Sequence, residues 1–293
     1  MLRLFFSLLL ALGSFTTSDN VTLHYETVGH GDPVVILSGG PGFAVGYMKP
    51  VADVVARRHQ AVLFHQRGTG LSAVTSYDTL TLDGAVSDLE ALREELKVNK
   101  LTIVGHSWGG MLAMLYAQAH PDRVERIVLI DSGGLTTGFM DSFSKNLQAH
   151  ETAEDLDAIA YWRDPARKKE NPRHAAVETL KAKTASYFFD RRKSSGFRNA
   201  LHDDGYEPRV FGALAAAFAR YDVREGMKTL HAPVLIIHGR QDPLVAGGEL
   251  HAGIPGSKLV WIENAGHFPW IEQPEAFRKA IEPFLVLQRA LHQ

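Results

Sequence analysis

The chain of 293 residues contains no cysteine, which excludes disulfide bonds, thiolate zinc sites, cysteine nucleophiles and lipid attachment at a cysteine. It also lacks a concentrated basic region, because 31 Lys and Arg residues are offset by 33 Asp and Glu residues. Without such a footprint we expect no nucleic-acid partner. The metalloprotease pattern His-Glu-x-x-His is absent too, and we predict neither a metal site nor an organic cofactor.

The N-terminus carries one basic residue, Arg3, followed by an apolar run from Leu4 to Leu12 that only Ser7 interrupts. Small polar residues come next, and the pattern predicts a signal peptide over residues 1–18 with export to the periplasm or the medium. The run is shorter than the ~20 residues of a membrane-spanning helix, so no stable membrane anchor is expected. The alternative is a cytoplasmic protein whose apolar N-terminal helix packs on the domain.

Short apolar runs alternate with helical patterns along most of the chain. Residues 21–29 alternate apolar and polar side chains, which is typical of a half-exposed edge strand. The continuous runs predict strands buried on both faces, and they cover residues 34–37, 61–64, 101–104, 127–130, 234–237 and 259–262. Helical patterns cover residues 82–98, 110–119 and 274–288. This alternation predicts an α/β fold with a mostly parallel, doubly wound sheet.

The alternation stops between residues 135 and 229, where the sequence is polar and helical without a buried strand. We predict that this segment is a helical lid inserted between two parts of the core, residues 19–134 and 230–293. A separate helical domain is the alternative. In the lid, Trp162, Tyr187 and Phe188 are expected to shape a partly apolar pocket for a small molecule or short peptide. Glu207 is a candidate for binding a substrate amine.

Ser107 lies between a predicted strand and a predicted helix, in the pattern Gly105-x-Ser107-x-Gly109. This context is typical of a nucleophile elbow, in which glycines permit a strained turn that exposes the serine oxygen at the sheet edge. The N-terminus of the following helix adds partial positive charge where an oxyanion would form. The alternative is a glycine-rich turn whose serine only caps the helix.

A serine nucleophile needs a base, and His267 follows the last predicted strand. Asp242 follows the strand before it, so both lie where parallel strands end and functional groups gather. The order Ser107, Asp242, His267 is the one expected for this architecture, with Asp131 as the second choice for the acid. Other histidines near strand ends, namely His65, His106 and His238, are expected to be packed or hydrogen-bonded.

The backbone N–H groups of Trp108, directly after the serine, and of Gly40, in the loop after an early strand, are the predicted oxyanion donors. Three motifs then carry a resemblance to a known family. They are Ser38-Gly39-Gly40-Pro41-Gly42, His65-Gln66-Arg67-Gly68-Thr69-Gly70-Leu71-Ser72 and Gly105-His106-Ser107-Trp108-Gly109-Gly110. Over residues 21–132 and 230–285 the chain resembles α/β-hydrolase serine peptidases of the prolyl aminopeptidase (proline iminopeptidase) type. The resemblance implies the same triad and oxyanion donors, and an α/β-hydrolase fold.

The chain departs from that family at three places. Ser38 and His65 stand where the family usually has His and Asp, and no acid precedes Tyr187-Phe188, where the family has an amine-binding glutamate. We therefore expect a serine hydrolase that cleaves an amide or ester bond through an acyl-enzyme, most like a prolyl aminopeptidase. A carboxylesterase for small esters is the first alternative, and a non-catalytic binding protein of the same fold is the second.

Overall fold

All six continuous apolar runs form strands of one sheet in the computed structural model, which describes residues 11–78 and 80–286. The strands pair in parallel in the order β4-β3-β5-β6-β7-β8. They are β3 (Pro33–Leu37), β4 (Gln60–His65), β5 (Leu101–His106), β6 (Val124–Ile130), β7 (Val234–Gly239) and β8 (Lys258–Ile262). The chain order reverses beside β3 and β5, which places a ligand crevice at the carboxyl ends of these strands. The predicted fold class is confirmed.

Two antiparallel strands extend the sheet beyond β4. Strand β2 (Thr22–Gly29) pairs with β4, and β1 (Ala11–Thr16) pairs with β2 from Ala11 opposite Thr27 to Thr16 opposite Thr22. The expected edge position of residues 21–29 is therefore wrong, because β1 covers that side of β2. The ring of Phe15 packs over Phe64, with ring centroids 6.3 Å apart.

The sheet begins inside the segment predicted as a signal peptide. Strand β1 precedes the expected core boundary at residue 19, and beyond it Asp19 forms an ion pair with the buried Arg67, 3.0 Å apart. Arg67 also donates from Nε to Asp88 at 2.9 Å. Residues 1–10, with most of the apolar run, lie outside the described residues, and export stays a prediction. Within the described part of the chain, no helix has the length and apolarity needed to cross a bilayer.

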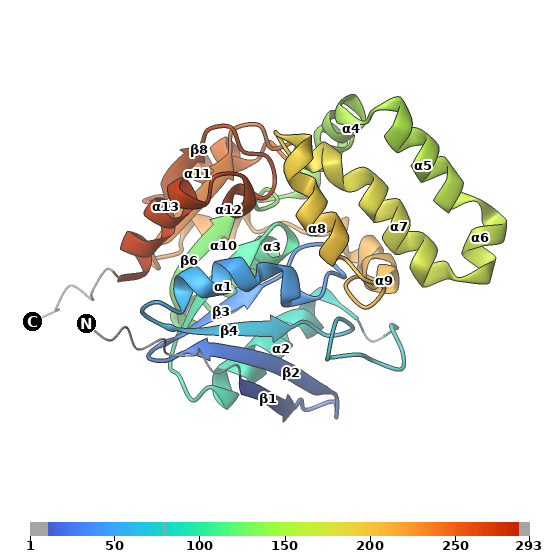
Figure 1. Cartoon of the computed structure of the whole chain (residues 1–293). Coiled ribbons are helices and arrows are strands. Elements are labelled where there is room, and N and C mark those ends of the chain that lie inside the picture. Colours follow the sequence, from blue (N-terminus) through green and yellow to red (C-terminus); the bar gives the residue numbers. More distant parts are fainter. Residues whose placement is uncertain (1–10, 79, 287–293) are drawn as a thin grey trace, which may run out of the picture.

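Helices cover both faces of the sheet (Figure 1). On one face lie α1 (Lys49–Val55) and α13 (Pro274–Val286), and on the other lie α2 (Leu82–Glu95), α3 (Trp108–Ala119), α10 (Arg224–Lys228) and α11 (Gly247–Gly253). In β3, Val35 and Leu37 join the core under α2 and α3, while Val34 and Ile36 join the core under α1 and α13. Burial on both faces explains why such strands are continuously apolar.

A helical insertion separates β6 from β7 and extends past the sheet (Figure 1). Its two ends meet where the Val223 N–H donates to the Leu135 carbonyl at 2.9 Å and Thr136 pairs with Asp222. Between these ends lie α4 (Met140–His150), α5 (Ala153–Arg163), α6 (Pro165–Glu170), α7 (Pro172–Thr184), α8 (Ser194–Ala200) and α9 (Pro208–Phe218). Helix α10 packs against α3 instead and buries Met227 in the core. The helical insertion is thus residues 136–222, which is shorter than the predicted lid.

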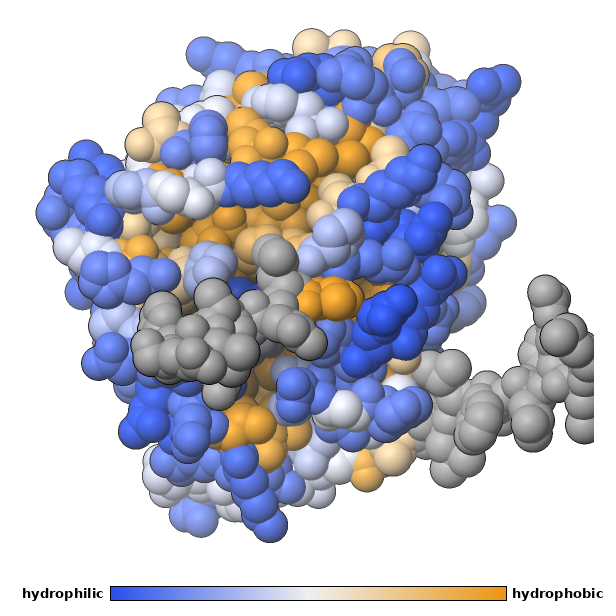
Figure 2. Space-filling view, turned by 90° about the vertical axis from the view of Figure 1, so that its left-hand side faces the viewer, coloured by the Kyte–Doolittle hydropathy of each residue, from blue (hydrophilic) through white to orange (hydrophobic). Residues whose placement is uncertain are grey.

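The N-terminal ends of the parallel strands face away from this insertion. Figure 2 shows that side of the molecule, where apolar surface is bordered by hydrophilic residues. A groove of about 860 Å³ opens there between the starts of β3, β5 and β6 and the end of α13. The catalytic candidates lie at the opposite edge of the sheet.

Candidate active site

Ser107 occupies a strained turn between β5 and α3, with φ 53° and ψ −117°. A positive φ is unfavourable for a residue with a side chain, and packing around the turn must enforce it. The Ser107 N–H donates to the Ile130 carbonyl at 3.0 Å. A Cβ on Gly105 would lie 2.3 Å from the Gly109 carbonyl oxygen, and one on Gly109 would lie 2.6 Å from that of Leu37. Only glycines therefore allow β5, α3 and β3 to approach closely enough to form this elbow.

The three sequence motifs form one buried hydrogen-bonded unit around the elbow. The Trp108 indole N–H donates to Gln66 Oε1 at 2.8 Å. Gln66 Nε2 then donates to the Ser38 carbonyl at 2.9 Å, and the Ser38 hydroxyl donates to the Phe43 carbonyl at 2.8 Å. The residue after the nucleophile is thereby tied to the loop that carries Gly40. This unit explains why the motifs occur together, and Ser38 has a defined bonding role in it.

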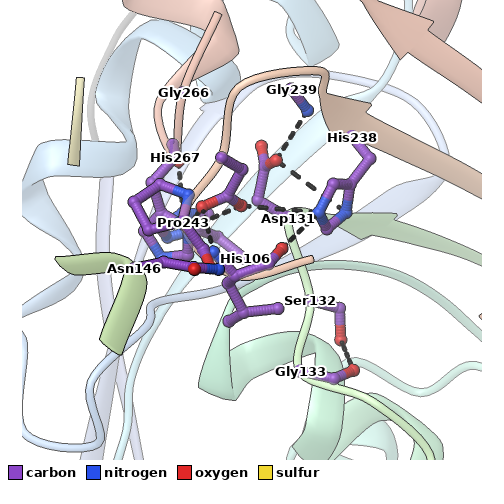
Figure 3. Close-up of polar contacts among 12 residues, drawn as sticks. His106, Asp131, Ser132, Gly133, Asn146, His238, Gly239, Pro243, Gly266 and His267 are labelled. Carbon is purple, nitrogen blue, oxygen red and sulfur yellow. Dashed lines mark hydrogen bonds and ion pairs between the residues drawn. The ribbon is translucent and has the colours of Figure 1, made fainter. Parts of the chain in front are cut away.

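His267 and Asp242 form a buried pair next to the elbow. The Nδ1 atom of His267 lies 3.0 Å from Asp242 Oδ2 and 3.1 Å from Oδ1. A carboxylate only accepts, so Nδ1 carries the proton and Nε2 is left as the basic nitrogen. Asp242 also accepts the Leu244 N–H at 2.9 Å. In Figure 3, His267 lies on one side of the cluster of polar side chains, and Asp131 with His238 lies on the other.

Asp131, the second candidate for the acid, lies beside Asp242. Its Oδ1 accepts the Gly239 N–H at 2.7 Å. Burial, followed by the neighbouring charge of Asp242, raises the pKa of Asp131 well above 3.8. Burial raises the pKa of Asp242 as well, to about 8, but the interaction between the two carboxyl groups lowers the pKa of Asp242 and raises that of Asp131. Two adjacent buried carboxyl groups do not both ionise readily, so the proton of the pair favours Asp131 and Asp242 is the more acidic of the two.

Burial keeps the histidines of this cluster neutral. It lowers the pKa of His267 below 6.5, so the ring is an unprotonated base at pH 7. It also lowers the pKa of His238 to about 4. The Nε2–H of His238 donates to the Leu244 carbonyl at 2.6 Å. Asp131, His238 and Asp242 have ligand-type atoms within 4.8 Å of one another, as a metal site would. Asp131 Oδ2 and His238 Nδ1 have no hydrogen-bond partner among the described residues, while the other polar atoms of the three side chains make the hydrogen bonds given above.

Ser107 and His267 line one cavity of about 70 Å³. Gly39 and Gly40 form part of its wall, and the Trp108 N–H lies in the first turn of α3. Within the described residues, the Ser107 hydroxyl makes no hydrogen bond with His267. Such bonds often tighten only when substrate binds. The remaining lining is aromatic, aliphatic or neutral polar: Phe43, Tyr47, His106, Phe143, Leu180, Thr184, Tyr187, Phe197 and Phe268.

The residues predicted to bind substrate from the lid divide into two groups. Tyr187 lines the cavity. Phe188 points elsewhere and stacks on Phe268, with ring centroids 5.0 Å apart. Trp162 is in α5 and packs edge-on against a histidine of α7. Glu207 caps the N-terminus of α9 and pairs with an arginine there. Trp162, Phe188 and Glu207 therefore do not line the cavity.

Glu272 is a site residue that sequence reasoning missed. Its buried carboxylate accepts three backbone N–H groups: Gly266 at 2.6 Å, Phe189 at 3.2 Å and Asp190 at 2.8 Å. The His267 N–H donates to the backbone of the same insertion segment. Glu272 thus joins the loop that carries His267 to the helical insertion. The only signal in the sequence was an acidic residue five positions after the predicted base, and a glutamate in such a place is usually exposed at the surface.

A family model described as the alpha/beta hydrolase fold matches residues 32–274. The chain belongs to the α/β-hydrolase family. Proline iminopeptidase of Xylella fastidiosa is 30% identical over 287 residues, which cover 87% of this chain and 90% of that relative. A probable proline iminopeptidase of Leptolyngbya boryana is 29% identical, covering 87% of this chain and 88% of its own. The predicted resemblance is confirmed, and this α/β hydrolase is an enzyme.

Solved structures share the fold of this α/β hydrolase. The bromoperoxidase from Bacillus anthracis has a TM-score of 0.74 at 23% identity, covering 94% of this chain and 99% of its own. An esterase from Exiguobacterium antarcticum has a TM-score of 0.67 at 18% identity, covering 93% of this chain and 98% of its own. At these identities the likeness establishes the architecture alone.

We expect Glu272→Ala to lower the free energy of unfolding by about 3 kcal/mol, because three backbone donors lose a charged acceptor in a buried place. Urea unfolding measures the loss, and hydrogen exchange should quicken at residues 187–190 and 264–268. Glu275→Ala is the matched control, since its carboxylate is 74% exposed in a pair with Arg278 and should contribute below about 1 kcal/mol. Equal stability of the two variants would contradict the role assigned to Glu272.

The buried His238 predicts an acid-sensitive contribution to stability. Its folded pKa of about 4 is below the 6.5 of an exposed ring, so the unfolded chain takes up this proton first as the pH falls. His238→Gln keeps an N–H for the Leu244 carbonyl and cannot be protonated. Between pH 7.5 and 4.5, the parent should lose about 3 kcal/mol of unfolding free energy relative to His238→Gln. Urea unfolding at both pH values tests this, and parallel pH curves would refute it.

Proposed function

We propose that this α/β hydrolase cleaves an acyl bond through a covalent intermediate on Ser107. His267 Nε2 takes the hydroxyl proton as the serine oxygen attacks the acyl carbon, and then returns it to the leaving group. Asp242 fixes the tautomer of His267 and stabilises the charge that the ring gains. Water then attacks the acyl-enzyme with the same base, releasing the acid and restoring Ser107. The buried pair of Asp242 and His267 beside the strained elbow supports this sequence.

The Gly40 and Trp108 N–H groups are the proposed donors to the oxyanion. One lies in the loop after β3, which lines the cavity together with the serine, and the other lies in the first turn of α3. The hydrogen bonds from Trp108 through Gln66 to Ser38 favour a fixed spacing between these two amides. Fixed donors matter because each oxyanion donor contributes about 3 kcal/mol to transition-state stabilisation.

We further propose that the acyl group is short and uncharged. The cavity that Ser107 and His267 share has no Asp, Glu, Lys or Arg in its described lining. Its volume of about 70 Å³ is well below that of usual ligand pockets, which limits the acyl chain to a few carbons. A substrate ammonium group buried in this cavity would lack a counter-charge, which costs several kcal/mol by general desolvation arguments. The absence of charged side chains from the described lining is the observation that supports an esterase-like specificity.

An aminopeptidase is the second candidate, favoured by the proline iminopeptidases that are about 30% identical. It would need a carboxylate for the free α-amino group. Glu151 is the available acid, because its side chain is 5% exposed and lies 3.8 Å from Lys183. Burial raises the pKa of Tyr187, which lines the cavity, and the charges of Tyr206, Asp242 and, least of all, Glu151 add to the rise. In this candidate function, Glu151 would exchange Lys183 for the substrate amine.

Ser107→Ala should retain the fold and lower kcat by about four to six orders of magnitude, because the nucleophile is lost. A fluorophosphonate probe should label the parent and leave the alanine variant unlabelled. Ser76→Ala removes a surface serine and should keep full labelling and turnover. A parent that neither reacts with the probe nor hydrolyses any acyl substrate would instead support a non-catalytic binding protein.

A substrate panel separates the two candidates. We expect p-nitrophenyl acetate and butyrate to be cleaved faster than longer esters, and faster than Pro and Ala arylamides. Blocking the amino group of an Ala ester should raise kcat/KM, since the cavity offers no counter-charge to a free ammonium group. Glu151→Gln should leave ester cleavage unchanged. A strict need for a free amine, abolished by Glu151→Gln, would establish the aminopeptidase instead.

A further inference from the structure

Three hydrogen bonds connect the Gly40 loop to the loop of His267 through two side chains that the proposed mechanism does not use. The Gly39 N–H lies 2.6 Å from Tyr47 Oη. Tyr47 Oη lies 2.7 Å from His106 Nδ1, and His106 Nε2 lies 2.9 Å from the His267 carbonyl oxygen. Tyr47 is in the short helical turn Val45–Met48, and His106 directly precedes the nucleophile at the end of β5.

The two ends of this chain determine the direction of every bond in it. An amide N–H only donates and a carbonyl oxygen only accepts. The Tyr47 oxygen therefore accepts from Gly39 and gives its single proton to His106 Nδ1. His106 accepts at Nδ1 and donates from Nε2 to the His267 carbonyl. Only the neutral Nε2–H tautomer of His106 satisfies both contacts, and burial lowers its pKa well below 6.5 in agreement.

The same two rings are tightly packed. His106 is 2% exposed, and its ring centroid lies 4.6 Å from that of His267 and 4.9 Å from that of Trp270. The Tyr47 ring contacts His106 edge-on at 5.7 Å and also packs against Phe197 of the helical insertion. A displaced ring has no room to find another hydrogen-bond partner in such surroundings.

We propose that Tyr47 and His106 are positioning residues that hold the Gly39–Gly40 loop and the His267 loop at a fixed separation across Ser107. The inference rests on the proposed function, because it concerns the alignment of the oxyanion donor and the base. Gly39 precedes Gly40, so the bond to Tyr47 orients the neighbouring peptide group. The bond from His106 reaches the backbone of the base itself. One chain of polar contacts thus places both partners of the nucleophile.

This arrangement predicts a loss in the transition state without a loss in substrate binding. Tyr47→Phe keeps the ring and removes the oxygen, leaving the Gly39 N–H and His106 Nδ1 without these partners. We expect kcat for a short p-nitrophenyl ester to fall by roughly 10- to 100-fold, as small misplacements of reacting groups do. KM should stay within about twofold, because the cavity wall is retained.

An oxyanion mimic gives a sharper readout. A small trifluoromethyl ketone adds to the serine as a tetrahedral oxyanion, so its inhibition constant should rise in Tyr47→Phe by the factor by which kcat falls. The double variant Tyr47→Phe/His106→Phe should be no slower than the slower single variant, because each change breaks the same chain. Independent, multiplying losses, or a KM rise that accounts for the whole effect, would overturn the proposal.

Tyr221→Phe is the matched control. The Tyr221 side chain is 3% exposed and its hydroxyl has no hydrogen-bond partner among the described residues. Its loss should leave kcat and the inhibition constant unchanged. If Tyr221→Phe slows the enzyme as much as Tyr47→Phe, the effect comes from general loosening of the core, and the proposal fails.

Nitrogen-15 NMR of histidine-labelled protein tests the relay without any assay of activity. The His106 signals, identified by their loss in His106→Phe, should show a protonated Nε2 and an unprotonated Nδ1 at pH 7. The Nδ1 signal should move in Tyr47→Phe. A proton on Nδ1, or an Nδ1 signal that ignores Tyr47→Phe, overturns the relay even if the parent hydrolyses esters. A parent with the expected tautomer and no reaction with fluorophosphonate would refute the proposed function alone.

Discussion

The site depends on one strained residue. Ser107 keeps a positive φ that costs about 1–3 kcal/mol, and the surrounding packing must supply that energy. Glycines on both sides of Ser107 let α3 lie against β3, and the indole N–H of Trp108 donates to Gln66, in the loop that follows β4. The motifs are therefore parts of a single support for the turn. The motifs meet in space because β3 lies between β4 and β5 in the sheet.

The helical insertion takes part in the site through its backbone as well as its side chains. The Tyr187 carbonyl accepts the His267 N–H at 2.8 Å, and Glu272 accepts N–H groups from both segments. A movement of the insertion would consequently shift the loop that carries His267. Its aromatic side chains close a small neutral cavity over the serine. Family membership sets the architecture and the reaction class. The lining of the cavity affects whether esters or peptides with a free amino group can bind as substrates.

Local patterns predicted the strands and the main helices well, because burial on both faces leaves a continuous apolar signal. The patterns failed where the position of a segment depends on which other segment it contacts. Residues 21–29 have the alternating pattern of an edge strand, yet β1 pairs with that edge. The pattern could not show this, because a half-exposed antiparallel strand has the same alternation whether its edge faces solvent or another strand. The sequence pattern placed helix α10 in the lid. A helix of five residues is too short for its apolar periodicity to show that Met227 packs against the core.

The sequence by itself determined the fold class, the elbow at Ser107 and the positions of Asp242 and His267 after successive strands, because these depend on short-range periodicity and on the order of elements. Only the tertiary structure decided that Asp242 rather than Asp131 bonds to His267, that Tyr187 faces the cavity while Phe188 and Trp162 do not, and that Glu272 joins two loops. Those outcomes depend on side-chain direction and long-range contact. A linear pattern carries no information about either until the chain has packed.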